Sequence, residues 1–147
     1  MSAPTMSFPF PPDNHDGSST ATHDAPLSCD AVHTMLARVE VAKFVRRTAK
    51  ATAAEIGFGW VATPDAPSTY QQLRGAFAAS MATGGPLPVS SLHNDSSVFL
   101  KPEDNIAFRF WHDVSHVRLG LSFSLPDELE LATWHLAQAE QAGFDRG

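Results

Sequence analysis

A chain of 147 residues is long enough to form one compact domain and leaves little room for a second. Its 43% of hydrophobic and 18% of charged residues are typical of globular proteins, and no stretch approaches the roughly 18 uninterrupted apolar residues of a membrane-spanning helix. The net charge of −6 opposes approach to polyanions, so strong nucleic-acid binding is not expected.

The cysteine content bears on the cellular compartment. The single cysteine, Cys29, cannot form a disulfide within the chain, and a lone thiol is typical of reducing compartments. The N-terminal stretch also lacks the basic and then apolar pattern of a secretory signal. We therefore expect a cytoplasmic location.

The first 27 residues are expected to form a disordered tail, followed by a single α-helical domain over residues 28–147. Five of the 11 prolines lie in this segment, together with three acidic residues and no lysine or arginine. Because such a segment has little apolar surface, burial cannot offset the entropy that it would lose on ordering.

The first helix is predicted from about residue 30 to residue 55. Ser28 can cap its N-terminus, and Gly57 supplies the stop. The helix carries a basic cluster, which is either a phosphate-binding patch or simply a solvated face. The residues of this cluster are Arg38, Lys43, Arg46, Arg47 and Lys50.

A second helix is predicted to begin near Ser68, where two overlapping sequences match the capping-box pattern. Its apolar residues recur at helical spacing, and the glycines and proline at positions 84–86 end it. Residues 57–66, which precede this helix, are predicted to be irregular. The connection that follows it, 87–101, is predicted to contain one short β-like stretch at 97–100.

Two further helices complete the predicted fold. The third begins at Pro102, which suits the first turn of a helix, and ends before Gly120. The fourth begins near Pro126 and ends at Gly143. Because the loop between them is short, we expect an antiparallel helical hairpin. The predicted fold class is therefore all-α, with about four helices and a C-terminal hairpin.

One face of the third helix is polar, whereas most of its circumference is apolar. A helix that is apolar on most sides is buried on most sides, so its polar face borders either water or a polar interior site. Spacings of four, three and four residues place four side chains on this face, and a fifth lies at its edge. These residues are Asn105, Arg109, His112, His116 and, at the edge, Asp113.

The spacing of His112 and His116 lets two imidazoles reach one transition-metal ion. On the fourth helix, Glu128 and His135 are seven residues apart and share a face. In an antiparallel hairpin Glu128 lies level with His116, which predicts three ligands and an open fourth position. His135 is a further candidate ligand if the helices tilt or slide. We expect a divalent transition metal, with zinc as the default for two imidazoles and a carboxylate.

The pattern His112-Asp113-x-x-His116 resembles, over five residues, the HExxH helix of zinc peptidases, in which a downstream glutamate is the third ligand. The acidic position here holds an aspartate, one methylene shorter than glutamate. Glu128 also follows more closely than the third ligand of those peptidases. The resemblance implies metal-dependent hydrolysis but assigns no family.

The sequence favours a small metal-binding protein that acts as a metal-dependent hydrolase. In this interpretation Asp113 is the general base or orienting group, and Arg109 holds a small anionic substrate. The alternative is a non-enzymatic interaction module with a protein or nucleic-acid partner, in which the His/Arg/Asp cluster is a structural hydrogen-bond network. Bound metal and the distance between His112 and Glu128 discriminate between the two.

Overall fold

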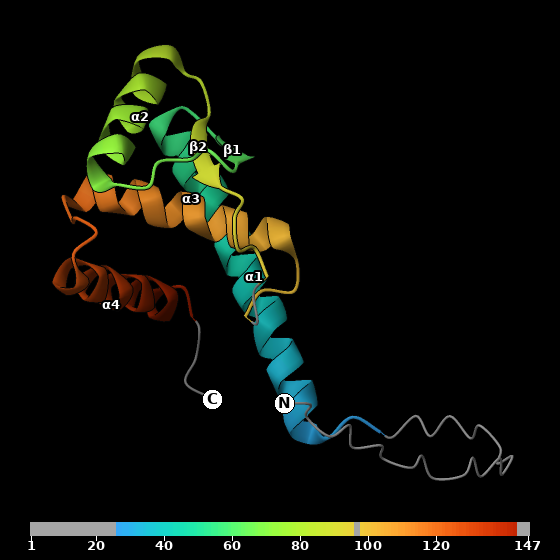
Figure 1. Cartoon of the computed structure of the whole chain (residues 1–147). Coiled ribbons are helices and arrows are strands. Elements are labelled where there is room, and N and C mark those ends of the chain that lie inside the picture. The colour runs from blue at the N-terminus through green and yellow to red at the C-terminus, as the bar shows by residue number, and fades with distance from the viewer. Residues whose placement is uncertain (1–25, 96–97, 144–147) are drawn as a thin grey trace, which may run out of the picture.

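The computed structural model describes residues 26–95 and 98–143, which form four helices and one two-stranded parallel sheet (Figure 1). Most of the tail predicted over residues 1–27 lies outside these described residues. The mainly helical class is confirmed, with a small sheet added. The elements in chain order are α1 (Cys29–Ile56), β1 (Trp60–Thr63), α2 (Tyr70–Thr83), β2 (Leu87–Ser90), α3 (Pro102–Leu119) and α4 (Leu125–Gln141).

Local signals at the helix ends set the boundaries of α1 and α3. The side chain of Ser28 accepts a hydrogen bond from the amide of Ala31, which is the predicted N-cap of α1. Gly57 ends α1 with a φ of 90°, a left-handed conformation that glycine adopts without strain. α3 begins at Pro102 and ends before Gly120, as predicted.

The position predicted for β structure is wrong. Residues 98–100, the described part of the predicted β-like stretch, contain no strand, whereas β1 and β2 lie in segments that were expected to be irregular or connecting. The two strands pair in parallel, with Trp60 opposite Leu87 and Thr63 opposite Ser90, and α2 connects them. Because parallel strands need such a crossover, their pairing is a long-range contact that a four-residue pattern does not reveal.

The core lies where α3 crosses α1 and where the sheet covers α3 (Figure 1). Phe110 and Trp111, in the middle of α3, are buried at 0% and 4% exposure. The ring of Phe110 stacks on Trp60 of β1 at a centroid distance of 4.6 Å, and Trp111 meets Phe44 of α1 edge-on at 5.5 Å. α3 is therefore the central element, and its packing fixes the position of its polar face.

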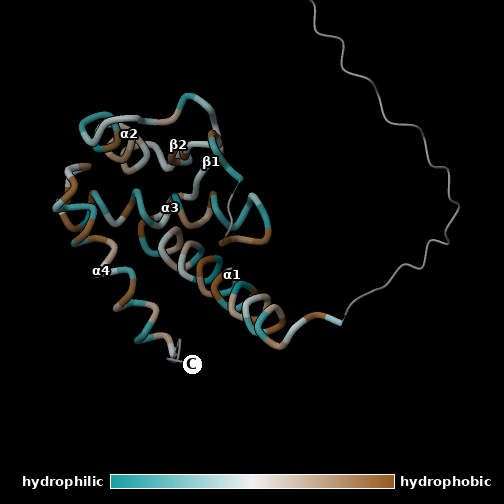
Figure 2. Tube along the Cα trace, turned by 60° about the horizontal axis from the view of Figure 1, so that its bottom comes forward, coloured by the Kyte–Doolittle hydropathy of each residue, from teal (hydrophilic) through white to brown (hydrophobic). Residues whose placement is uncertain are grey.

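The N-terminal half of α1 extends beyond this core and carries hydrophobic positions along its length (Figure 2). None of the helices within residues 26–95 and 98–143 is both long enough and apolar enough to cross a membrane. The large apolar side chains that this half of α1 exposes are those of Val32, Met35 and Leu36.

α4 follows α3 after a short loop, residues 120–124, but the closely packed antiparallel hairpin is not confirmed. The backbones of α3 and α4 approach each other at few positions, and side chains span the space between them. Trp134 and His135 of α4 contact Trp111 of α3 at centroid distances of 5.9 and 4.1 Å. In both views α4 lies on the opposite side of α3 from the sheet (Figures 1 and 2).

Candidate metal centre

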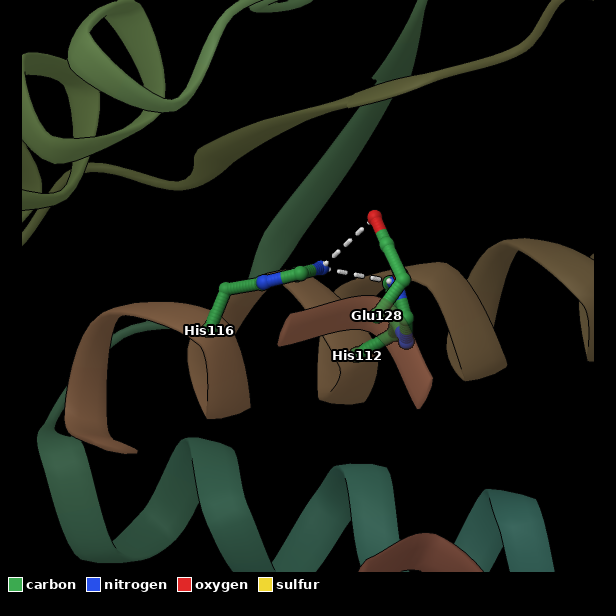
Figure 3. A group of neighbouring side chains, drawn as sticks. All are labelled: His112, His116 and Glu128. Carbon is green, nitrogen blue, oxygen red and sulfur yellow. Dashed lines mark hydrogen bonds and ion pairs between the residues drawn. The ribbon is translucent and has the colours of Figure 1, made fainter. Parts of the chain in front are cut away.

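The side chains of His112, His116 and Glu128 point toward one another, two from α3 and one from the first turn of α4 (Figure 3). The Nε2 atoms of the two histidines lie 3.0 Å apart. One Glu128 oxygen lies 3.4 Å from Nε2 of His116, and the other lies 3.5 Å from Nε2 of His112. Two donor atoms that share a tetrahedral zinc ion lie roughly 3.3 Å apart, because each is about 2.0–2.1 Å from the metal. The group could therefore hold one metal ion.

His116 is held in place because it also closes the end of α3. Gly120 takes a left-handed φ of 69°, and the turn brings the carbonyl oxygen of Leu121 to 2.9 Å from Nδ1 of His116. A carbonyl can only accept, so Nδ1 carries the hydrogen, and in the neutral imidazole Nε2 then presents a lone pair. The His116 side chain is 0% exposed, so this lone pair faces the centre rather than bulk water.

Glu128 reaches the centre because the loop before α4 is tied to the start of that helix. The carboxylate of Asp127 accepts hydrogen bonds from the hydroxyl and the amide of Ser122, and these bonds hold the pKa of Asp127 below its usual range. The side chain of Ser124 caps the helix by accepting from the amide of Asp127. The next residue, Glu128, therefore lies in a fixed first turn.

The centre contains more lone pairs than hydrogens. In the neutral form of His116, Nε2 has no hydrogen when Nδ1 donates to Leu121, and a carboxylate at Glu128 offers only acceptors. The one hydrogen that the three side chains can then share is a hydrogen on Nε2 of His112. Acceptors that converge in this way destabilise one another when they are partly buried, and a cation between them removes the conflict.

Burial keeps the two half-buried histidines of this region neutral. It is the main cause that lowers the pKa of His112 to about 3, and the imidazoles of His116 and His135 lower it further. Burial, followed by the influence of His116, lowers the pKa of His135 to about 4. The neutral imidazole is the form that binds metal, so His112 is available as a ligand at neutral pH.

His135, the further predicted ligand, is not brought into the group of three. Its Nε2 lies 3.1 Å from Nδ1 of His112, whereas Glu128 faces Nε2 of the same ring. The His135 ring packs against Trp111 at a centroid distance of 4.1 Å. Its Nδ1 is buried and has no hydrogen-bond partner among the described residues. His135 therefore contacts a ligand rather than converging with the three.

A pocket of about 260 Å³ adjoins the three side chains, and Asp113 lines it. Burial raises the pKa of Asp113 to about 7; the charge of Arg109 acts against this rise, and the charge of Glu128 adds to it. A carboxyl group with a pKa near neutrality can accept or donate a proton, whereas a bound divalent cation would lower that pKa. The predicted catalytic residue thus lies beside the candidate metal ligands.

Arg109 lines the same pocket, but its guanidinium is largely engaged by the backbone. Nη1 donates to the carbonyls of Ser90 and Leu92, both at 2.6 Å, and Nη2 donates to that of His93 at 2.9 Å. These bonds fasten the chain after β2 to α3. They leave two of the five guanidinium hydrogens, so binding of an anionic substrate by Arg109 stays a prediction.

Sequence reasoning missed the residues that complete the pocket. Pro67, Ser90 and Phe123 line it from the segment before α2, from β2 and from the loop before α4. Their side chains are neither metal ligands nor acids or bases, and no spacing pattern relates them. They come together through the parallel pairing of β1 and β2 and the turn after α3, so no sequence signal could have identified them.

The basic cluster of α1 is partly paired with acidic side chains. Arg46 donates two hydrogen bonds to Asp104 at the start of α3, whose side chain is only 2% exposed. These bonds, and the charge of Asp104, raise the pKa of Arg46. Lys43 pairs with Glu40 within α1. Two of the five basic residues are therefore engaged within the protein, and weak nucleic-acid binding stays a prediction.

Comparison of the chain with protein-family models, with curated proteins and with solved structures found no match. No relative therefore indicates what the centre binds. The interpretation of the site rests on the geometry and chemistry of its own residues.

Proposed function

We propose that this protein binds one divalent transition-metal ion through Nε2 of His112, Nε2 of His116 and the carboxylate of Glu128. The observation that carries the proposal is the convergence of these acceptor atoms, with separations from 3.0 to 3.5 Å. Zinc is the expected metal, because two imidazoles and one carboxylate form the donor set of many catalytic zinc sites.

We further propose that the protein is a metal-dependent hydrolase. Three protein ligands leave a coordination position for water, and a divalent cation lowers the pKa of that water toward neutrality. Asp113 lines the adjoining pocket, where its carboxylate can accept the proton. Arg109 lines it too and can offer its two remaining N–H groups to an anionic part of the substrate. A pocket of about 260 Å³ suits a small substrate.

The metal proposal is tested on untagged wild-type protein, because an affinity tag of histidines would itself bind zinc. We expect one equivalent of zinc per chain by elemental analysis, and saturable zinc binding by calorimetry after the metal is removed with a chelator. His33, an exposed histidine of α1, provides the matched control, since His33→Ala should bind zinc as the wild type does. Wild-type protein that neither retains nor takes up zinc, manganese, iron, cobalt or nickel would exclude the metal site.

The catalytic proposal is tested with Asp113→Asn. This variant should retain wild-type zinc content, because Asp113 is not one of the three converging residues. It should hydrolyse small activated esters and phosphoesters roughly 100-fold to 10,000-fold more slowly than the wild type, because an amide cannot accept the proton. Hydrolysis by the variant at the wild-type rate would rule out Asp113 as the base.

A protein-binding role is the second candidate function, and an apolar stripe on α4 favours it. Leu125, Leu129 and Leu136 lie on one face of the helix and are 72%, 61% and 61% exposed. Exposed apolar stripes of this kind often contact a partner. Two results together would favour this role over hydrolysis. The wild-type protein would contain no metal, and Leu129→Glu would abolish its association with a partner.

A further inference from the structure

The ring of His112 is contacted by α4 at both of its nitrogen atoms. Nε2 faces Glu128 at 3.5 Å, and Nδ1 faces Nε2 of His135 at 3.1 Å. Glu128 and His135 are seven residues apart, which places them two turns apart on the same face of α4. One helix face thus determines the orientation of His112 from both sides.

We propose that His135 is a positioning residue, which accepts the Nδ1 hydrogen of His112 and thereby reserves the Nε2 lone pair of His112 for the metal. A neutral imidazole carries its hydrogen on one nitrogen, and the other nitrogen is then the free donor. An acceptor on the far side of a ligand histidine fixes both the tautomer and the ring orientation. This inference rests on the proposed metal site and adds a specific role for a residue outside the three ligands.

When no metal is bound, the same contacts place the hydrogen of His112 on Nε2 rather than on Nδ1. His116 donates from Nδ1 to Leu121, so in its neutral form Nε2 accepts across the 3.0 Å contact to Nε2 of His112. His112 therefore carries its hydrogen on Nε2, and its Nδ1 accepts a hydrogen bond from Nε2 of His135. Metal binding consequently reverses the direction of the hydrogen bond between His112 and His135.

The reversal leaves both rings neutral. One proton leaves Nε2 of His112 for solvent as the metal takes that lone pair. The hydrogen shared by the two rings passes from Nε2 of His135 to Nδ1 of His112, and Nδ1 of His135 gains one proton from solvent. His135 thus changes from the Nε2–H to the Nδ1–H tautomer, with no net change in charge.

The surroundings of His135 fit this role, because they hold the ring without selecting a tautomer. Its ring lies among aromatic side chains, with centroid distances of 4.1 Å to Trp111, 5.3 Å to Trp134 and 5.6 Å to Phe108. Nδ1 is buried and has no hydrogen-bond partner among the described residues. A carbonyl or an amide at that atom would lock one tautomer, whereas an apolar environment leaves the choice to His112.

The first test compares zinc affinities, measured by competition with a chromophoric chelator. His135→Phe keeps the aromatic packing but removes the acceptor, so zinc affinity should fall by roughly 10-fold to 100-fold. His135→Gln places an amide oxygen close to the position of Nε2 and should recover most of the affinity. His33→Phe on α1 is the matched control and should leave affinity unchanged. If His135 had only a packing role, His135→Phe would keep the zinc affinity and His135→Gln would lower it.

The second test reads the tautomers of the wild-type protein directly and needs no variant to fold. Two-dimensional ¹H–¹⁵N NMR spectra of the imidazole rings distinguish Nδ1–H from Nε2–H, and zinc addition should convert His135 from the second to the first. A His135 tautomer that does not change on zinc binding, or a His135→Phe variant with wild-type affinity, overturns the inference and leaves the metal proposal intact. Wild-type protein that binds no metal overturns both.

Discussion

Replacing His116 with alanine is expected to abolish stoichiometric zinc binding and to destabilise the metal-free protein by about 1–3 kcal/mol. Its side chain is fully buried, at 0% exposure, and its Nδ1–H donates to the Leu121 carbonyl at 2.9 Å. Alanine removes a ligand and also leaves that carbonyl without its partner at the end of α3. Calorimetry measures the first effect, and urea unfolding of chelator-treated protein measures the second.

A matched variant separates the two effects. Glu128 contributes to the same centre, but its side chain is 38% exposed. Glu128→Gln should therefore weaken zinc binding strongly while the stability of the metal-free protein changes little. If His116→Ala retained one equivalent of tightly bound zinc, the ligand assignment would be wrong. If it lost zinc without any loss of stability, the structural role of Nδ1 would be wrong.

Replacing Phe110 with alanine is expected to lower the free energy of unfolding by about 3–5 kcal/mol. Phe110 is 0% exposed, and its ring stacks on Trp60 at a centroid distance of 4.6 Å, so truncation leaves a cavity between α3 and β1. A loss of this size is a large part of the roughly 5–15 kcal/mol that stabilises a typical domain. Urea unfolding followed by circular dichroism measures it.

The control for this variant is Leu36→Ala on the extended half of α1. Leu36 is 57% exposed, so its truncation should change the free energy of unfolding by less than about 0.5 kcal/mol. Equal destabilisation by the two substitutions would contradict the core described above and would indicate that the N-terminal half of α1 is buried in solution.

The helices could be predicted from the sequence because their signals are local. A capping serine at position 28, a proline at 102 and glycines at 57 and 120 act through the backbone next to them. The strands could not be predicted for the opposite reason. β1 and β2 have four residues each, and their parallel pairing forms only after α2 has returned the chain.

The same distinction applies to the candidate metal centre. His112 and His116 could be paired because a four-residue spacing on a helix is a local geometric fact. Glu128 could be placed near them from the short loop, although the antiparallel hairpin of α3 and α4 is not confirmed. The seven-residue spacing places His135 on the same face of α4 as Glu128. Its contact with the far nitrogen of His112 also depends on how α4 packs against Trp111, which is a long-range contact.

The sparse backbone contact between α3 and α4 has a consequence for how the protein opens. α4 makes few backbone contacts with the other described elements, and segments of this kind detach by local unfolding at a lower free energy than the whole domain needs. Glu128 and His135 lie on α4, whereas His112 and His116 lie on α3, so an ion at the centre would join the two helices. The binding free energy would then be added to the cost of detaching α4, and metal occupancy would set how often the C-terminal helix leaves the core.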